Sequence, residues 1–222
     1  MIKIVNPDKL TRQPFFQDLV SWLYPNKTVT LRQIKQAFPT IRSIDRFIED
    51  YVQAGYLLRK DRRYSLTLPL ATDSQAVDLD KMLFVDTESP LYQELLTKTF
   101  TTALTNQTNQ AVLLEETDLF RTEATLANYF YALRRSLPLP DSLQPLYAVL
   151  GDVNQEYALK YITAFLLKFS RRSAVPQKRP DIFVQALEEL GYIAKNADGK
   201  YELRLNFAKE SLTFRTKAAS KG

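Results

Sequence analysis

The chain of 222 residues contains no cysteine and no histidine. These two absences exclude Cys/His zinc sites, histidine-ligated haem, Ser–His and Cys–His nucleophilic sites and disulfide scaffolds. The five glycines are scattered, whereas a P-loop or a dinucleotide-binding fingerprint needs clustered glycine. We therefore expect no catalytic residues, no metal and no cofactor, and predict that the protein is not an enzyme. Chemistry based on Lys, Tyr or carboxylates stays open.

Long hydrophobic runs are also missing. No stretch reaches the roughly 18 apolar residues of a membrane span, and the first residues show no basic segment followed by an apolar one. The composition, 45% hydrophobic and 25% charged, is that of a globular protein. The sequence therefore predicts a cytoplasmic protein without membrane association, and the lack of cysteine fits that compartment.

The net charge of +5 is distributed unevenly along the sequence. Residues 1–72 carry +6, residues 73–123 carry −7, and residues 124–222 carry +6. Two basic segments around an acidic one suggest outer modules that face a polyanion. Chance segregation of the charges is the alternative interpretation.

The first 70 residues show a helix–helix–helix–hairpin order. A helix is expected after Pro14, a second one after Thr30 as N-cap, and a third from near Ser43 to Gly55. Two alternating apolar runs, 56–60 and 64–68, then predict a β-hairpin. This order resembles the winged helix-turn-helix superfamily over about residues 13–70.

The resemblance implies contacts with duplex DNA. In such modules a helix enters the major groove while the hairpin lies along phosphates, which here assigns these roles to helix 40–53 and the basic wing 59–63. The candidate residues are Thr40, Arg42, Ser43 and Arg46 of the helix, and Arg59, Lys60, Arg62 and Arg63 of the wing. The alternative is that Arg42 and Arg46 are solvated and pair with Asp45, Glu49 or Asp50.

The Gly-Tyr junction after the third helix recurs 136 residues later. Gly191-Tyr192 follows a helical stripe at 182–190 and precedes the hairpin signal Asp198-Gly199. Before the stripe, residues 171–179 are too short for another helix, so the second winged-helix-like module is partial. This connector carries Arg171, Arg172, Lys178 and Arg179, which we interpret as phosphate contacts or, alternatively, as a solvated loop.

The predicted fold class is mainly α with small β-hairpins. We expect a winged-helix module at 1–72, an acidic helical linker at 73–140, a second winged-helix-like module at 141–215 and a flexible tail at 216–222. The carboxylates of the linker lack EF-hand spacing and are expected to be solvated rather than to bind a cation; they include Glu115, Glu116, Asp118 and Glu123.

A long helix expected over 154–170 is apolar on more than one side. Its apolar positions include Tyr157, Tyr161 and Phe165, a face wider than a surface helix needs. Other helices of the chain, at 124–137 and 182–190, or a second copy of the protein must cover it. A homodimer is therefore an open alternative.

The opening residues carry a second resemblance. The run from Asn6 to Phe16, NPDKLTRQPFF, followed by the module above, resembles a family of uncharacterised proteins of low-GC Gram-positive bacteria, classed as a domain of unknown function. The resemblance extends over most of the chain. It implies a bacterial cytoplasmic protein and brings no catalytic residue, cofactor or ligand.

Two functions follow from these observations. The first is a nucleic-acid-binding protein, a DNA-binding transcriptional regulator that contacts duplex DNA through helix 40–53 and wing 59–63. The second is a winged-helix protein–protein interaction or scaffold protein that binds no DNA. Fold alone does not decide between them.

Overall fold

The computed structural model describes residues 1–216. The chain divides into two compact units, Met1–Lys98 and Thr99–Gly222. The boundaries predicted after residues 72 and 140 thus lie inside the first and the second unit. Of the tail predicted at 216–222, all but Thr216 lies outside the described residues.

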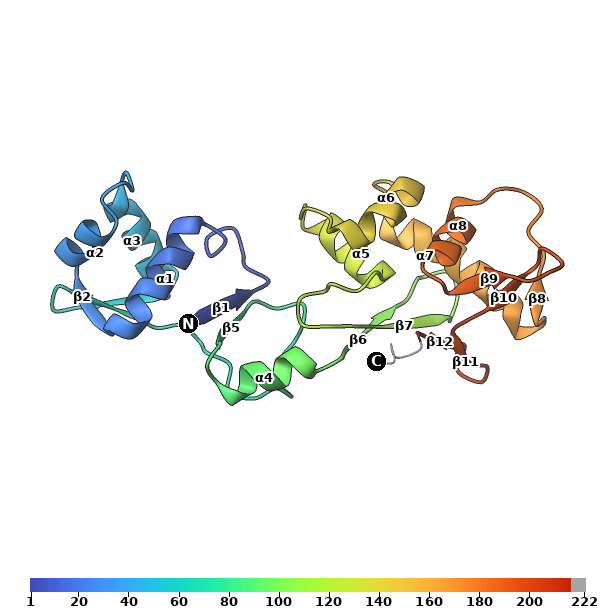
Figure 1. Cartoon of the computed structure of the whole chain (residues 1–222), viewed down its shortest axis with the longest axis horizontal. Helices are drawn as coiled ribbons and strands as arrows, with labels where there is room; N and C mark the ends of the chain where they lie inside the picture. Colours follow the sequence, from blue (N-terminus) through green and yellow to red (C-terminus); the bar gives the residue numbers. More distant parts are fainter. Residues whose placement is uncertain (217–222) are drawn as a thin grey trace. The chain divides into compact units, whose positions relative to one another are not determined.

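The first unit combines helices with two small antiparallel sheets (Figure 1). One sheet has the strand order β2-β4-β3, and the other pairs β1 with β5. Its elements are β1 (Ile2–Val5), α1 (Pro14–Asn26), β2 (Thr28–Thr30), α2 (Leu31–Ala37), α3 (Ile44–Gln53), β3 (Leu57–Lys60), β4 (Arg63–Leu66), β5 (Leu83–Asp86) and α4 (Pro90–Thr97).

Local sequence explains where these helices start. Pro14 occupies the first turn of α1, where its missing N–H costs no hydrogen bond. Thr30 and Gln33 form a reciprocal capping box at the start of α2. The helices then bury one face each around Phe16, Ile48 and Tyr51, which are almost inaccessible to solvent.

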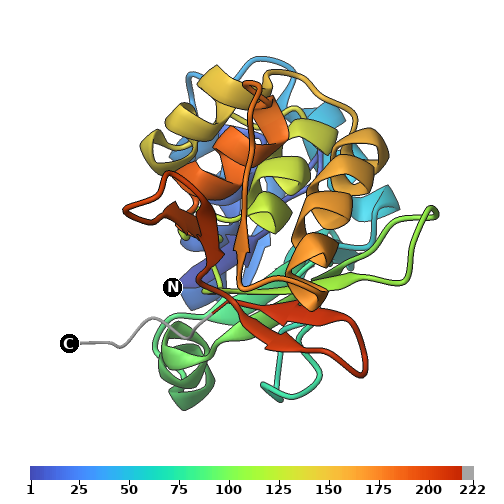
Figure 2. The same cartoon turned by 90° about the vertical axis from the view of Figure 1, so that its right-hand side faces the viewer.

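The second unit is built on a four-stranded sheet of order β11-β12-β7-β6. The helices α5–α8 lie together on one side of this sheet (Figures 1 and 2). A smaller sheet has the order β8-β10-β9. The elements are β6 (Phe100–Leu104), β7 (Val112–Thr117), α5 (Leu126–Arg134), the 3₁₀ helix η1 (Asp141–Leu143), α6 (Gln144–Leu150), α7 (Gln155–Leu166), the 3₁₀ helix η2 (Leu167–Ser170), β8 (Ala174–Val175), α8 (Ile182–Glu189), β9 (Ile193–Lys195), β10 (Tyr201–Leu203), β11 (Asn206–Ala208) and β12 (Thr213–Arg215).

The predicted fold class is wrong. The protein is mixed α/β, 38% helical and 21% strand with four sheets, and neither unit is identified as a winged helix. The predicted helical linker at 73–140 contains the strands β5, β6 and β7 beside α4 and α5. The sequence did not predict strand β7, because its buried face carries the polar residues Glu115 and Thr117 as well as Leu113 and therefore lacks a regular alternation of apolar and polar residues.

Both expected hairpins are present, after Gly55 and after Gly191. The first is formed by β3 and β4, the second by β9 and β10. Each glycine has a positive φ, +78° and +69°, a conformation that glycine adopts without the strain of a Cβ atom. The glycines therefore end α3 and α8 and direct the chain into the hairpins.

Candidate nucleic-acid interface

The β3–β4 hairpin ends in a compact cationic turn. Lys60 is paired with Arg63 across the ladder, which leaves Asp61 and Arg62 as the two turn residues. Their φ values of +51° and +59° are those of a type I′ turn, whose twist matches that of the strands. Lys60, Arg62 and Arg63 are exposed, and none of them takes part in an ion pair among the described residues. The hairpin tip therefore presents three available cations to solvent.

The third helix starts near Ser43, as the sequence indicates, and later than the range 40–53 given for its DNA contacts. The helix begins at Ile44, and Ser43 precedes it in a left-handed conformation with φ 55° and ψ 35°. The predicted helix 40–53 is therefore too long at its start, because the left-handed residue interrupts helical geometry before the buried Ile44. Thr40, Arg42 and Ser43 lie in the preceding turn, and Arg46 alone of these candidates belongs to the helix. Arg42 and Arg46 are both exposed.

Two ion pairs neutralise carboxylates on the exposed side of α3. Lys35 Nζ lies 2.7 Å from Asp45 Oδ2, and Arg59 Nη1 lies 2.9 Å from Glu49 Oε2. Exposed pairs of this kind add little stability, yet they cancel negative charge that would repel a polyanion. Asp45 and Glu49 are thus paired with residues of α2 and β3 rather than with the arginines of α3. Arg59 lies opposite Tyr64, next to the pair that closes the turn, and its ion pair with Glu49 makes it less available than the cations of the tip.

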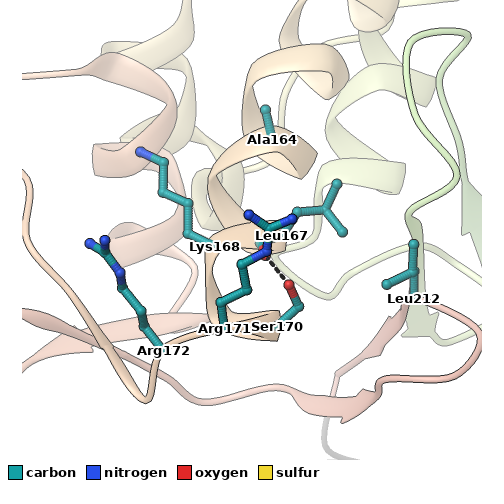
Figure 3. A pocket seen from close by; sticks show the side chains of 7 residues that line it. All are labelled: Ala164, Leu167, Lys168, Ser170, Arg171, Arg172 and Leu212. Atoms are coloured by element: carbon teal, nitrogen blue, oxygen red, sulfur yellow. Dashed lines mark hydrogen bonds between the residues drawn. The ribbon is translucent and has the colours of Figure 1, made fainter.

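In the second unit the structure separates the cations of the predicted connector. Arg171 and Arg172 line an open hollow of about 610 Å³ together with Lys168 (Figure 3). Ser170 in the same wall donates a hydrogen bond of 2.7 Å to the Leu167 carbonyl. The sequence analysis did not include Lys168 among the candidate phosphate contacts, because Lys168 belongs to the helix expected over 154–170 and not to the connector. Its exposed position on that helix could have indicated it.

Lys178 and Arg179 line a different hollow, together with Asp181, Glu188 and Lys195. Glu188 is already paired with Lys195, at 3.2 Å. This second hollow therefore mixes charges of both signs, whereas Lys168, Arg171 and Arg172 gather without a carboxylate. The four predicted connector cations do not form one site.

One carboxylate of the acidic segment is deeply buried, contrary to the expectation of a solvated surface. Glu115 is 1% exposed and accepts hydrogen bonds from the N–H groups of Leu126 and Ala127, at 3.0 and 2.6 Å, and from the Tyr192 hydroxyl. Burial raises the pKa of Glu115 to about 7, although these three hydrogen bonds lower it. Glu115 therefore caps α5 and joins β7 to the second Gly-Tyr junction. Within residues 1–216, no group of three or more His, Cys, Asp or Glu side chains could hold a metal ion.

The segment that contains α3 and the first hairpin is similar to a known sequence family. Residues 2–98 match a domain of unknown function, DUF1803. This DUF1803 match coincides with the first compact unit and covers less than half of the chain, so the resemblance is narrower than the sequence suggested. No curated protein and no solved structure matches the chain. In the part of the chain that the structure describes, no helix has the length and apolar character needed to cross a membrane.

Proposed function

We propose that this protein binds duplex DNA through its first unit and acts as a transcriptional regulator. The observation that carries the proposal is the set of exposed cations at α3 and the first hairpin that form no ion pair among the described residues: Arg42, Arg46, Lys60, Arg62 and Arg63. Of the carboxylates around them, Asp45 and Glu49 are paired with other cations, which leaves Asp61 of the turn and Asp50 of α3 against these five cations. The net field of this surface is therefore positive and suits a polyanion.

The two groups of cations suit different parts of a duplex. Lysine and arginine at a narrow hairpin tip neutralise phosphates and position the protein without reading sequence. Arg46 stands on the exposed face of α3, and an arginine on a helix can form two hydrogen bonds with guanine in the major groove. The tip would thus supply affinity, and Arg46 would supply sequence preference.

The proposal includes a cellular location and an oligomeric state. The resemblance of the opening residues to proteins of low-GC Gram-positive bacteria supports a cytoplasmic location, where DNA is accessible. A homodimer would present two first units to one duplex, and sedimentation of the free protein and of the complex measures this state.

The salt dependence of binding to a labelled duplex of random sequence tests the proposal. Each neutralised phosphate contributes about −0.9 to the slope of log affinity against log salt, so five contacts give a slope of about −4.5. Replacing all five cations by Ala should remove most of this slope and of the affinity at low salt. Circular dichroism checks folding, which exposed substitutions should preserve.

Wild-type protein that shows no duplex binding at low salt contradicts the proposal. Equal binding by the folded five-cation variant contradicts it as well. Either result would favour the alternative, a protein-interaction or scaffold role.

A further inference from the structure

Two tyrosines of α7 remain exposed although the sequence predicts that they are covered. Tyr157 is 53% and Tyr161 is 39% exposed, whereas Phe165 on the same helix is buried. Other helices of the unit therefore cover only part of the wide apolar face of α7. What remains is an aromatic surface open to solvent.

The aromatic surface is rigidly supported. The rings of Tyr157 and Tyr161 are 4.9 Å apart, and Tyr161 stacks on Phe183 of α8 with an interplanar angle of 7° and a centroid distance of 5.2 Å. Phe183 is buried, so the neighbouring helix fixes the orientation of the exposed rings. Fixed aromatic faces are suited to stacking with planar ligands.

The same side of the helix continues into the basic hollow. Positions 157, 161, 164 and 168 follow helical spacing and thus share one face. Ala164, Lys168 and Arg172 all line this hollow, and the side chains of Lys168 and Arg172 point in the same direction (Figure 3). The run from Tyr157 to Lys168 covers about 17 Å, given the rise per residue of an α-helix and a 3₁₀ turn.

The charge along this strip is positive. Its exposed cations are Lys160, Lys168, Arg171 and Arg172, and no ion pair among the described residues involves any of them. The Lys160 ammonium lies 5.5 Å from the centre of the Tyr161 ring. The nearby Glu156 carboxylate accepts a hydrogen bond of 2.6 Å from the N–H of Gln107. Residues 157–172 thus contain four cations and no carboxylate, although Glu156 lies directly before Tyr157.

We infer that this strip binds single-stranded nucleic acid. Unpaired bases stack on Tyr157 and Tyr161, and the phosphates that follow lie against Lys168, Arg171 and Arg172. Aromatic faces next to cations are the combination that single strands recognise, whereas the bases of a duplex are already stacked on each other. A second copy of the chain suits the strip less well, because a two-fold contact would bring its four cations close to four identical ones.

Fluorescence anisotropy with the full chain and a labelled oligothymidylate of 15 nucleotides tests the inference. The double variant Tyr157→Ala/Tyr161→Ala should bind at least about 10-fold more weakly, because stacking is lost at two bases. The matched variant Tyr157→Phe/Tyr161→Phe keeps both rings and should bind within about 2-fold of wild type. Tyr147→Ala, which removes another exposed tyrosine of the same unit on α6, should have no effect.

Two further measurements distinguish the strip from the duplex site of the first unit. The variant Lys168→Ala/Arg171→Ala/Arg172→Ala should reduce the salt slope for the oligothymidylate by about 2, since each contact with a single strand contributes about 0.7. Replacing thymidine by 5-iodouridine should place photochemical crosslinks at Tyr157 or Tyr161. The five-cation variant of the first unit should keep these crosslinks even if its duplex binding is lost or was never present.

Unchanged oligothymidylate affinity in the folded double-alanine variant, or crosslinks confined to the first unit, would overturn the inference. A wild-type dimer that the double-alanine variant converts to a monomer, with oligothymidylate binding unchanged, would also overturn it. That outcome would identify the strip as a contact between copies.

Discussion

The two Gly-Tyr junctions, Gly55-Tyr56 and Gly191-Tyr192, have the same local structure. In both, the glycine N–H donates to the carbonyl three residues earlier and the tyrosine N–H to the carbonyl five residues earlier, at 2.9–3.0 Å. These are the two hydrogen bonds of a Schellman motif. In both, a backbone N–H after the hairpin returns to the tyrosine carbonyl, at 2.9 and 2.8 Å. A short sequence therefore specifies a helix end and the hairpin that follows, in two different units.

The tyrosine hydroxyls of the junctions reach different environments. The Tyr56 hydroxyl donates a hydrogen bond of 3.4 Å to the Asp8 carboxylate near the surface, whereas the Tyr192 hydroxyl donates a hydrogen bond to the buried Glu115. Partial burial raises the pKa of Asp8, but hydrogen bonds from Thr11 and Leu10 outweigh it and hold that pKa below its usual value. Burial raises the pKa of Glu115 to about 7. The tertiary surroundings, rather than the local motif, thus decide how each junction is stabilised.

The hairpins also differ in the state of their cations. Lys195 of the second hairpin lies 3.2 Å from Glu188, and Lys200 lies 3.9 Å from Asp198. The first hairpin keeps Lys60, Arg62 and Arg63 unpaired within the described residues. Two hairpins of similar construction therefore differ in whether their cations are paired, and this difference is why we propose DNA contact for the first hairpin rather than the second.

The largest expected effect concerns the carboxylate partners of the two tyrosines. Glu115→Ala should lower the free energy of unfolding by about 3–5 kcal/mol, because it leaves two buried N–H groups and a hydroxyl without an acceptor and creates a cavity. Asp8→Ala should cost about 1 kcal/mol, the usual value for losing an exposed cap. Urea denaturation followed by circular dichroism measures both. Equal costs would contradict the difference between the junctions.

The second prediction concerns pH. Since the pKa of Glu115 rises from 4.5 in the unfolded chain to about 7 on folding, its contribution to stability is complete below pH 4.5 and is lost as the pH rises through 7. The loss is about 3 kcal/mol, from the cost of one pKa unit. The contribution of Asp8 to stability changes with pH in the opposite direction. It is present above pH 3.8 and is lost as the pH falls through the lowered pKa of Asp8.

Denaturation of the wild type and of Glu115→Gln between pH 4.5 and 8 measures this effect. The wild type should lose stability over this range, and the variant, which cannot ionise at this position, should lose about 3 kcal/mol less. Parallel curves for the two proteins would show that Glu115 does not titrate in this way.

The smallest expected effect is a loss of stability that should be equal at the two junctions. Gly55→Ala and Gly191→Ala should each cost about 1 kcal/mol, because alanine is strained at positive φ. An added Cβ meets no atom within 4 Å at either site, so no steric clash increases the cost. Asn tolerates this conformation better, and Gly55→Asn and Gly191→Asn should cost less. Unequal costs for the two alanine variants in urea denaturation would show that the junctions are not locally equivalent.

The sequence was informative where local residues determine structure. Pro14, Thr30 and the two glycines correctly indicated the start of helices α1 and α2 and the end of α3 and α8. These signals depend on backbone conformation and capping within a few residues, so a single sequence contains them.

The sequence was uninformative where distant segments meet. Strand β12 pairs in parallel with β7, with Thr213 opposite Val112, and no local pattern indicates such a partner. Glu115 has the sequence appearance of a solvated acid, because its hydrogen-bond partner Tyr192 is 77 residues away. The ion pair of Arg59 with Glu49 likewise depends on how β3 packs beside α3. Which cations remain available for a ligand therefore had to come from the structure.

The most direct test of the account compares duplex binding by matched variants of the two hairpins. Lys60→Ala/Arg62→Ala/Arg63→Ala removes the unpaired cations of the first, and Lys195→Ala/Lys200→Ala removes the paired cations of the second. The first variant should reduce the salt slope by about 2.7, at about 0.9 per phosphate contact, and bind weakly at low salt. The second should bind as the wild type does. Equal binding by the wild type and the first variant, or a larger loss in the second, would contradict the assignment of DNA contact to the first hairpin.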